Sequence, residues 1–345
     1  MTSPVQGGTT RSDGPVRHGN AGSVDLRRAI LARLSDGASH SGAILAAELF
    51  RSRTAIWKGV RALAGAGLEV RAVRGKGYQL PGTIELLDAG TIARLLDPEA
   101  ARTLSRLDVF FQAGSTNEFL LEQPSLHGHA ALAEYQTAGR GRRANRWISP
   151  PASGVCLSLG WRFDSAPSSL MMLSLLSAVA VLRALHRCGV NGVGLKWPND
   201  LVYDGRKLGG ILVESRGQIA GAVDVVLGLG LNVRLPRGAG IALDQPVTDL
   251  AAVAGAQPSR NRLAALLISE SLRMFHDCDA GETQGYMKEW RRHDTGRGRV
   301  ARLRLPDREL HGKIVDIDDN GLLVMWIGGK EQRFSSGELS LRVDP

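Results

Sequence analysis

The sequence contains little cysteine, few aromatic residues and no long apolar segment. Cysteine occurs three times in 345 residues, at Cys156, Cys188 and Cys278. The three are far apart and odd in number, and none of their spacings is typical of a metal site. This usage is typical of the reducing cytoplasm, where we expect the chain to be located.

The absence of a long apolar run argues against a membrane-spanning helix. Such a helix needs about 20 consecutive apolar residues, and the longest candidate, 170–185, contains serines and Arg183. We therefore predict a buried helix there. The amino terminus also lacks the apolar core of a secretory signal. A chain of 345 residues is long for one domain and predicts two or three.

Positive charge is concentrated near the amino terminus. The formal net charge is +9, and residues 24–82 hold ten lysines and arginines against four aspartates and glutamates. A basic unit at one end of a chain indicates a polyanionic partner.

The pattern of the same segment predicts a winged helix-turn-helix. Apolar periodicity predicts three helices, at 25–36, 42–50 and 53–64. Ser41 and Ser52 are suited to cap the second and third. Two short strands, 68–73 and 77–80, follow and enclose a basic turn. Two helices joined by a short turn, followed by a basic hairpin, are typical of a DNA-binding domain.

The candidate DNA contacts lie off the apolar face of the third helix and at the tip of the hairpin. They are Arg53, Thr54, Lys58, Arg61, Arg74 and Lys76. Another interpretation is a protein–protein module with a solvated basic face, but the excess of bases over acids favours DNA. Trp57 could pack against the first helix or lie on a phosphate, and packing is the commoner role.

Glycine alternates with arginine in the stretch 134–147. Gly139 and Gly141 permit tight turns and a close approach of the backbone to a ligand. Three arginines supply rigid forks of donors that suit carboxylate and phosphate oxygens: Arg140, Arg142 and Arg143. The stretch therefore predicts an anion-binding loop. Two other interpretations are a solvated or nucleic-acid-binding basic loop and a dinucleotide fingerprint. The fingerprint needs a helix directly after its glycines, which Pro150 and Pro151 prevent.

Four further motifs accompany this loop in a fixed order. They are Ser115-Thr116-Asn117, Lys196-Trp197-Pro198-Asn199-Asp200-Leu201, Lys207-Leu208-Gly209-Gly210-Ile211-Leu212-Val213-Glu214 and Gly228-Leu229-Gly230-Leu231-Asn232. Each motif alone is weak, but the ordered set resembles the biotin protein ligases. With the basic amino-terminal unit, the chain is similar to the bifunctional members that also repress the biotin operon. The resemblance extends from about residue 23 onward.

Patterns and resemblance together predict an α+β multidomain protein. The expected units are a disordered tail (1–23), a winged helix-turn-helix DNA-binding domain (24–82), a mixed α/β catalytic domain of the biotin/lipoate ligase type (83–296) and an SH3-like C-terminal β-barrel (297–345). In the catalytic unit, apolar patterns predict strands at 109–112, 130–136, 154–161, 193–196, 207–214 and 222–232, and helices at 91–96, 116–121, 168–187, 261–275 and 284–290. The last unit is predicted to hold strands at 300–305, 309–315, 321–326 and 331–334, with a hairpin turn at 318–321.

The resemblance implies biotinylation in two steps. The carboxylate of biotin would attack the α-phosphorus of ATP to give biotinyl-5′-AMP, and a lysine of the biotin carboxyl carrier protein of acetyl-CoA carboxylase would attack this adenylate. ATP and biotin would be substrates, and Mg²⁺ would assist. The adenylate would also favour a homodimer that binds operator DNA of biotin-synthesis genes.

The resemblance also implies roles for individual residues. Those expected to contact biotin or the adenylate are Ser115, Thr116, Asn117, Gln136, Gly139, Arg140, Gly141, Arg142, Arg143, Trp147, Asn199, Lys207, Gly209 and Asn232. The expected catalytic residues are Lys207, Arg142, Lys196 and Asp200, and Asp200 is also the expected Mg²⁺ ligand. Trp147 is expected near adenine or in the core. The family often has glycine at the position of Ala144 and lysine at that of Arg146, which concerns the mobility of a loop that closes over the adenylate.

Three other functions compete with this prediction. A lipoate or octanoate ligase shares the fold, but the motif 196–200 and the winged helix argue against it. A DNA-binding regulator with an inactive ligase site is disfavoured by the complete set of cations. The third is a biotin ligase whose winged helix no longer regulates transcription, and the sequence leaves it open.

Overall fold

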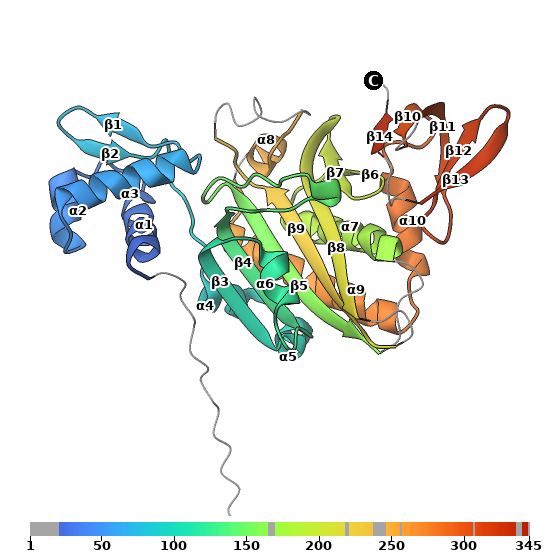
Figure 1. Ribbon diagram of the computed structural model, residues 1–345, viewed down its shortest axis with the longest axis horizontal. Helices are drawn as coiled ribbons and strands as arrows, with labels where there is room; N and C mark the ends of the chain where they lie inside the picture. Colours follow the sequence, from blue (N-terminus) through green and yellow to red (C-terminus); the bar gives the residue numbers. More distant parts are fainter. Residues whose placement is uncertain are drawn as a thin grey trace, which may run out of the picture.

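The computed structural model describes residues 21–164, 170–217, 221–236, 246–255, 257–305, 308–335 and 340–343. Figure 1 shows an amino-terminal helical unit, a central sheet with helices, and a small sheet at the carboxyl end. The predicted tail, 1–23, lies outside the described residues except for 21–23, which already form the start of the first helix. No helix in the described ranges is long and apolar enough to cross a membrane.

The amino-terminal unit is a winged helix-turn-helix, as predicted. It consists of α1 (Ala21–Leu34), α2 (Gly42–Glu48), α3 (Arg53–Gly65), β1 (Arg71–Val73) and β2 (Gly77–Gln79). The hydroxyls of Ser41 and Ser52 cap α2 and α3 by accepting from backbone N–H groups at 3.1 Å. The second helix ends two residues earlier than expected, because Phe50 has a φ of 51° that a helix does not permit. The hairpin is fixed to the turn before α2 by two backbone hydrogen bonds of 2.9 Å between His40 and Tyr78.

The winged helix packs against the central unit at the strands that lead to the arginine loop. Its apolar core continues into Phe111, Tyr135 and Ala152. Arg27 of α1 donates to the Tyr135 hydroxyl at 2.9 Å and to Gln112 Oε1 at 2.8 Å. These contacts connect the DNA-binding unit to residues next to the pocket described below.

The central unit is a seven-stranded mixed sheet. Its strands, in spatial order, are β3 (Arg106–Ala113), β4 (His129–Gln136), β5 (Gly154–Phe163), β9 (Val223–Asn232), β8 (Arg206–Gly217), β7 (Asp200–Tyr203) and β6 (Gly194–Lys196). Only β3 and β4 are paired in parallel; the other neighbours are antiparallel. The short strand β7 was not predicted.

Helices surround this sheet. They are α4 (Ala89–Leu95), α5 (Pro98–Thr103), α6 (Thr116–Leu121), the single turn η1 (Arg142–Ala144), α7 (Leu170–Arg187), α8 (Leu250–Ala254), α9 (Arg260–Asp279) and α10 (Gln284–His293). The short helices α5 and α8 were not predicted. The long helices α7 and α9 were, although the residues before Leu170 lie outside the described ranges.

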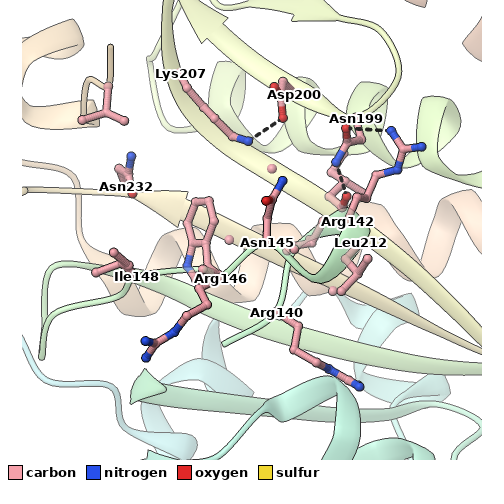
Figure 2. Close-up of a pocket in the computed structure, with 18 of the residues that line it drawn as sticks. Arg140, Arg142, Asn145, Arg146, Ile148, Asn199, Asp200, Lys207, Leu212 and Asn232 are labelled. Carbon is pink, nitrogen blue, oxygen red and sulfur yellow. Dashed lines mark hydrogen bonds and ion pairs between the residues drawn. The ribbon is translucent and has the colours of Figure 1, made fainter. Parts of the chain in front are cut away.

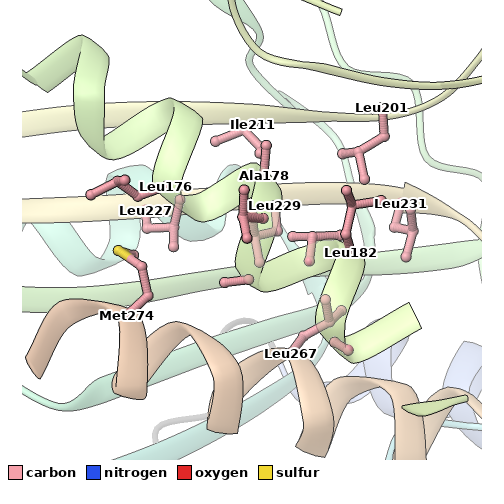
Figure 3. Packing of buried hydrophobic residues seen from close by; sticks show 14 of the residues in the cluster. Leu176, Ala178, Leu182, Leu201, Ile211, Leu227, Leu229, Leu231, Leu267 and Met274 are labelled. Carbon is pink, nitrogen blue, oxygen red and sulfur yellow. The ribbon is translucent and has the colours of Figure 1, made fainter. Parts of the chain in front are cut away.

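The two faces of the central sheet carry different residues, because successive side chains of a strand point to opposite faces. On β9, Leu227, Leu229 and Leu231 point to one face, where α7 and α9 cover them with Leu182 and Leu267 among others (Figure 3). The intervening residues, Gly228 and Gly230, therefore point to the opposite face. That face therefore lacks a side chain at these two positions, and it borders the pocket.

The predicted small β unit at the carboxyl end is confirmed as a five-stranded antiparallel sheet. Its order is β13 (Lys330–Phe334), β12 (Leu323–Ile327), β11 (Glu309–Ile317), β10 (Val300–Arg304) and β14 (Ser340–Val343). The predicted turn is present, and Asp318 Oδ1 accepts from the N–H groups of Asn320 and Leu322. The buried Trp197 donates its indole N–H to the Gly321 carbonyl at 3.2 Å, so one of the central motifs contacts this unit directly.

A side chain would have a different cost at each of two glycines in the wing. Gly75 and Gly77 have φ values of 74° and 101°, but only at Gly77 would a Cβ meet another atom, His40 O at 2.0 Å. Gly75→Ala should therefore cost about 1 kcal/mol of winged-helix stability. Gly77→Ala should cost clearly more, because the backbone must also move. Hydrogen exchange across residues 24–82 measures both losses, and equal losses would contradict the argument.

Candidate functional site

A pocket of about 890 Å³ lies between the arginine loop and the glycine-bearing face of the sheet. This volume is typical of small-molecule and cofactor sites. Most of the predicted site residues line it: Ser115, Thr116, Asn117, Gln136, Arg140, Gly141, Arg142, Arg143, Trp147, Lys196, Asn199, Asp200, Lys207 and Asn232. Figure 2 shows how the loop and the strands β7 to β9 converge on it.

Two predicted residues, Gly139 and Gly209, do not line the pocket. A Cβ at Gly209 would meet Gly230 O at 2.8 Å and Leu231 Cδ1 at 2.9 Å, on the core side of the sheet. Its neighbour Gly210 borders the pocket instead. Gly139 packs on the backbone of Trp147, where a Cβ would lie 2.5 Å from a carbonyl oxygen. Both glycines permit close packing around the site rather than contact with a ligand.

Glycines form the floor of the pocket. Gly210 on β8 is paired with Gly230 on β9, and Gly228 lies two residues before Gly230 on the same face. A Cβ at Gly228 would lie 2.3 Å from Asn117 Oδ1, and one at Gly230 would lie 2.4 Å from the indole of Trp147. The missing side chains therefore make room for Asn117 and Trp147, and Trp147 lies in the pocket rather than in the core.

Neutral polar groups are concentrated at one end of the pocket, near the start of α6. Gln136 Oε1 accepts from the Thr116 N–H at 2.8 Å and lies 3.2 Å from its hydroxyl. The Ser158 hydroxyl lies 2.7 Å from Thr116 Oγ1 and 2.5 Å from Asn117 Oδ1. Asn117 Nδ2 in turn donates to Glu214 Oε2 at 2.8 Å. Donors and acceptors thus alternate within a small, largely buried cluster.

The arginine loop is closed on itself by backbone hydrogen bonds. The Trp147 N–H donates to Gly139 O at 2.9 Å, and the Gly141 N–H donates to Asn145 O at 2.7 Å. Arg140 crosses from the loop to the sheet and pairs with Glu214 at 3.1 Å. The loop is therefore a small folded unit that lies over the glycine floor.

The turn of this loop carries backbone strain. Arg143 and Ala144 both have a φ of 57°, in the left-handed region that a non-glycine residue occupies at a cost of about 1 kcal/mol or more. Glycine, which the family often has at the position of Ala144, would occupy this conformation without that cost. The departure from the family at Ala144 therefore lies at a strained residue.

Arg142 is held over the pocket from the opposite strands. Its Nη1 lies 3.5 Å from Asn199 Oδ1, while Asn199 Nδ2 donates to Ile211 O at 2.7 Å (Figure 2). Burial and the neighbouring charge of Arg143 lower the pKa of Arg142, and Asp200 opposes this. Because burial disfavours the charged form of this half-buried guanidinium, an anionic ligand beside it would stabilise its charge strongly.

Lys207 and Asp200 form an ion pair at the other side of the pocket. Lys207 Nζ lies 2.7 Å from Asp200 Oδ1, and each side chain is about one-fifth exposed. The backbone of Lys207 is fixed by hydrogen bonds of 2.9 Å to Pro246 and Thr248. Asn232 holds the same segment, because its Nδ2 donates to Thr248 O at 3.0 Å. Lys207 therefore lines the pocket with its ammonium group paired to Asp200.

Several lining residues were missed by the sequence analysis. Ser158 on β5, Gly228 and Gly230 on β9 and Arg302 on β10 all border the pocket. The two-residue spacing of the β9 glycines was a usable signal, because it places both on one face. Ser158 and Arg302 carried no signal, since strand order and the placement of the last sheet decide their position.

The part of the chain that the structure describes contains no group of three or more metal-ligating side chains. Asp200 is the one carboxylate that lines the pocket there. A cation held largely by protein groups is therefore not supported in the described residues. One carboxylate beside ligand phosphates is an arrangement that Mg²⁺ commonly uses.

A mixed sheet with a glycine floor, a polar cluster and a ring of cations defines a ligase of the biotin/lipoate type. Residues 111–232 match the biotin/lipoate A/B protein ligase family, 26–79 match an HTH domain, and 298–342 match the biotin protein ligase C terminal domain. The chain is 36% identical over 315 residues to the bifunctional ligase/repressor BirA of Escherichia coli, covering 91% of this chain and 96% of that protein. It therefore belongs to the BirA-type family of biotin protein ligases with a helix-turn-helix domain.

Two further relatives agree. A biotin--[acetyl-CoA-carboxylase] ligase of Mycobacterium tuberculosis is 35% identical over 68% of this chain and 88% of its own length. The solved biotin protein ligase of Aquifex aeolicus, in complex with biotin and ATP, superposes with a TM-score of 0.61 at 23% identity, over 70% of this chain and all of that one. At this identity the likeness concerns the fold.

The contact between Asn199 and Arg142 predicts how firmly the loop is held. Asn199→Ala removes a hydrogen bond worth about 1 kcal/mol, which corresponds to a roughly fivefold greater population of the open loop. Trypsin should then cleave within 139–147 several times faster, as mass spectrometry of the fragments would show. Asn191→Ala, an exposed asparagine between α7 and β6 that does not line the pocket, is the control. Unchanged cleavage of the Asn199 variant would show that the contact does not restrain the loop.

Proposed function

We propose that the chain activates biotin with ATP and transfers it from biotinyl-5′-AMP to a lysine of a biotin carboxyl carrier protein. The observation that supports this best is the division of one pocket into two chemical halves. Neutral hydrogen-bonding groups gather near α6, and the cations Arg142, Lys196 and Lys207 gather at the other side. Biotinyl-5′-AMP is divided in the same way, because it joins an uncharged ring to an anionic acyl phosphate.

The neutral half favours biotin over lipoate. The ureido ring of biotin presents N–H donors and a carbonyl acceptor, which Thr116, Asn117 and Ser158 can match. The dithiolane of lipoate or the chain of octanoate would desolvate these groups without using the donors and acceptors that their mutual hydrogen bonds leave over. Each donor or acceptor left unpaired in this way costs about 1–3 kcal/mol. A lipoate or octanoate ligase is therefore the less well supported function.

The cationic half suits the charge that develops during adenylation. When the biotin carboxylate attacks the α-phosphorus, the bond to the pyrophosphate breaks and negative charge spreads over phosphate oxygens. Lys207 and Arg142 both line the cationic half, where Asp200 pairs with Lys207 and also acts on the charge of Arg142. Both cations would stabilise the developing charge. Asp200 would supply one carboxylate oxygen to Mg²⁺, whose chemistry is to neutralise phosphate charge. The transfer step then needs positioning of the acceptor lysine rather than a protein nucleophile.

The arginine loop would act as a lid in both steps. It is small and is strained at Arg143 and Ala144, so it is suited to open for substrates and to close over the adenylate. Closure excludes water, which would otherwise hydrolyse the mixed anhydride. Trp147, at the end of the loop, would provide an aromatic surface near the adenine.

Biotin-dependent exchange of pyrophosphate with ATP tests the first step. We expect exchange with biotin and none with lipoate or octanoate, and transfer to a carrier domain detected by streptavidin blotting. Exchange with lipoate but not with biotin would overturn the assignment.

The role of Lys207 gives a second test. Lys207→Ala should lower the adenylation rate by about two orders of magnitude, since removal of one such charge-stabilising donor costs about 3 kcal/mol. Its backbone hydrogen bonds to 246–248 are retained, so the fold should survive. Lys330→Ala, on the last sheet, is the matched control. Exchange at a normal rate in the Lys207 variant would exclude the catalytic role.

We also propose that the winged helix represses biotin-synthesis genes when biotinyl-5′-AMP accumulates in the cytoplasm. The adenylate would favour a homodimer through pairing of central sheet edges, and two winged helices on one twofold axis would meet an inverted repeat. Support comes from the basic residues of α3 and the wing and from the contact of Arg27 with Tyr135, the residue before Gln136. A ligase without a regulatory role is the alternative.

The contact of Arg27 predicts how the two functions are coupled. Arg27→Ala should leave adenylation intact but reduce, by up to about tenfold, the factor by which biotinyl-5′-AMP tightens DNA binding. Arg33→Ala is the control, because Arg33 pairs with Glu48 inside the winged helix. Fluorescence anisotropy with promoter DNA of the biotin-synthesis genes measures the factor. If biotinyl-5′-AMP tightens DNA binding by the same factor in the Arg27 variant, the coupling does not pass through this contact. If it does not tighten DNA binding in the wild type, the proposed regulatory role fails and only the ligase activity stands.

A further inference from the structure

An exposed tryptophan lies in the middle of the helix proposed to meet DNA. Trp57 of α3 is 47% exposed, whereas Ile56 and Val60 of the same helix are buried. Of the two roles left open for Trp57, full burial against the first helix is not observed. Its neighbours on the exposed side are Arg53, Thr54, Lys58 and Arg61. A large apolar ring is thus presented to the outside from within a basic surface.

Arg61 is held on the face of this ring. Its Cζ lies 5.1 Å from the ring centroid, within the range of a cation–π contact, and one helical turn separates the two residues. Among the residues that the structure describes, no carboxylate forms an ion pair with Arg53, Lys58 or Arg61. The partner of this face must therefore supply negative charge around an apolar contact point.

The major groove of DNA combines these two properties. Phosphates line both sides of the groove, and the C5-methyl of thymine is the apolar group that the base edges present within it. An apolar surface of another protein would instead leave the surrounding cations without counter-charges. The residues in the first half of a recognition helix are those that reach base edges, and Trp57 is the fifth residue of α3.

We propose that Trp57 recognises a thymine methyl in each half-site and positions Arg61 to bind a nearby guanine. The inference rests on the proposed DNA-binding function and adds base specificity to it. Four residues of helix advance about 6 Å, close to two base pairs at about 3.4 Å each. The thymine and the guanine should therefore lie within about two base pairs of each other.

The test begins with selection of duplexes from a randomised DNA library by the full chain with biotin and ATP. Each thymine of the selected site is then replaced by deoxyuridine, which removes only the methyl. One replacement in each of the two half-sites removes two methyls and should weaken binding by the wild type about 15-fold, equivalent to about 1.6 kcal/mol. Trp57→Ala should bind the thymine and deoxyuridine duplexes equally, and Trp57→Phe should retain part of the difference.

Trp326→Ala is the matched control, because Trp326 is equally exposed, at 50%, but lies in β12 of the last sheet. It should discriminate as the wild type does, and all variants should keep biotin-dependent pyrophosphate exchange. If Trp57→Ala distinguishes thymine from deoxyuridine as the wild type does, the assignment of Trp57 is overturned while DNA binding stands. If the wild type enriches no sequence, the proposed DNA-binding function fails as well.

Discussion

The site depends on the absence of side chains along one face of a single strand. On β9 the glycines at 228 and 230 alternate with leucines that the two long helices bury. A methyl group at either glycine would occupy the position of Asn117 or of the Trp147 ring. The same alternation therefore provides the apolar core on one side of the sheet and an open floor on the other. The loop, the polar cluster and the cations are arranged around that floor.

The arginine loop, which borders the glycine floor, carries several cations and two residues with strained backbone. Arg143 and Ala144 adopt an unfavourable conformation, and burial disfavours the charge of Arg142. An anionic ligand beside Arg142 would offset the cost of burying its charge. The ion pair of Arg140 with Glu214 and the contact of Arg142 with Asn199 hold the loop over the floor.

The sequence predicted the elements well where a period or a cap defined them. Ser41 and Ser52 cap the helices that they were expected to cap, and the alternating strands appear at the expected places. It failed where position depends on contacts between distant segments. Gly209 and Gly210 are adjacent in the sequence, and only the pairing of β8 with β9 shows that the second faces the pocket. Trp57 could not be assigned for the same reason, because exposure depends on how the helices pack.

The hydrogen bond from Trp197 to Gly321 has a consequence for the order in which the molecule is built. Trp197 belongs to the motif that supplies Lys196, Asn199 and Asp200 to the pocket, and its indole N–H gains its partner, the Gly321 carbonyl, only once the last sheet has folded. Arg302 and Leu341 of that sheet border the pocket as well. During synthesis, the winged helix can therefore fold long before the pocket is complete. A nascent chain would hold a finished DNA-binding unit while its ligase half is still unfinished on the ribosome.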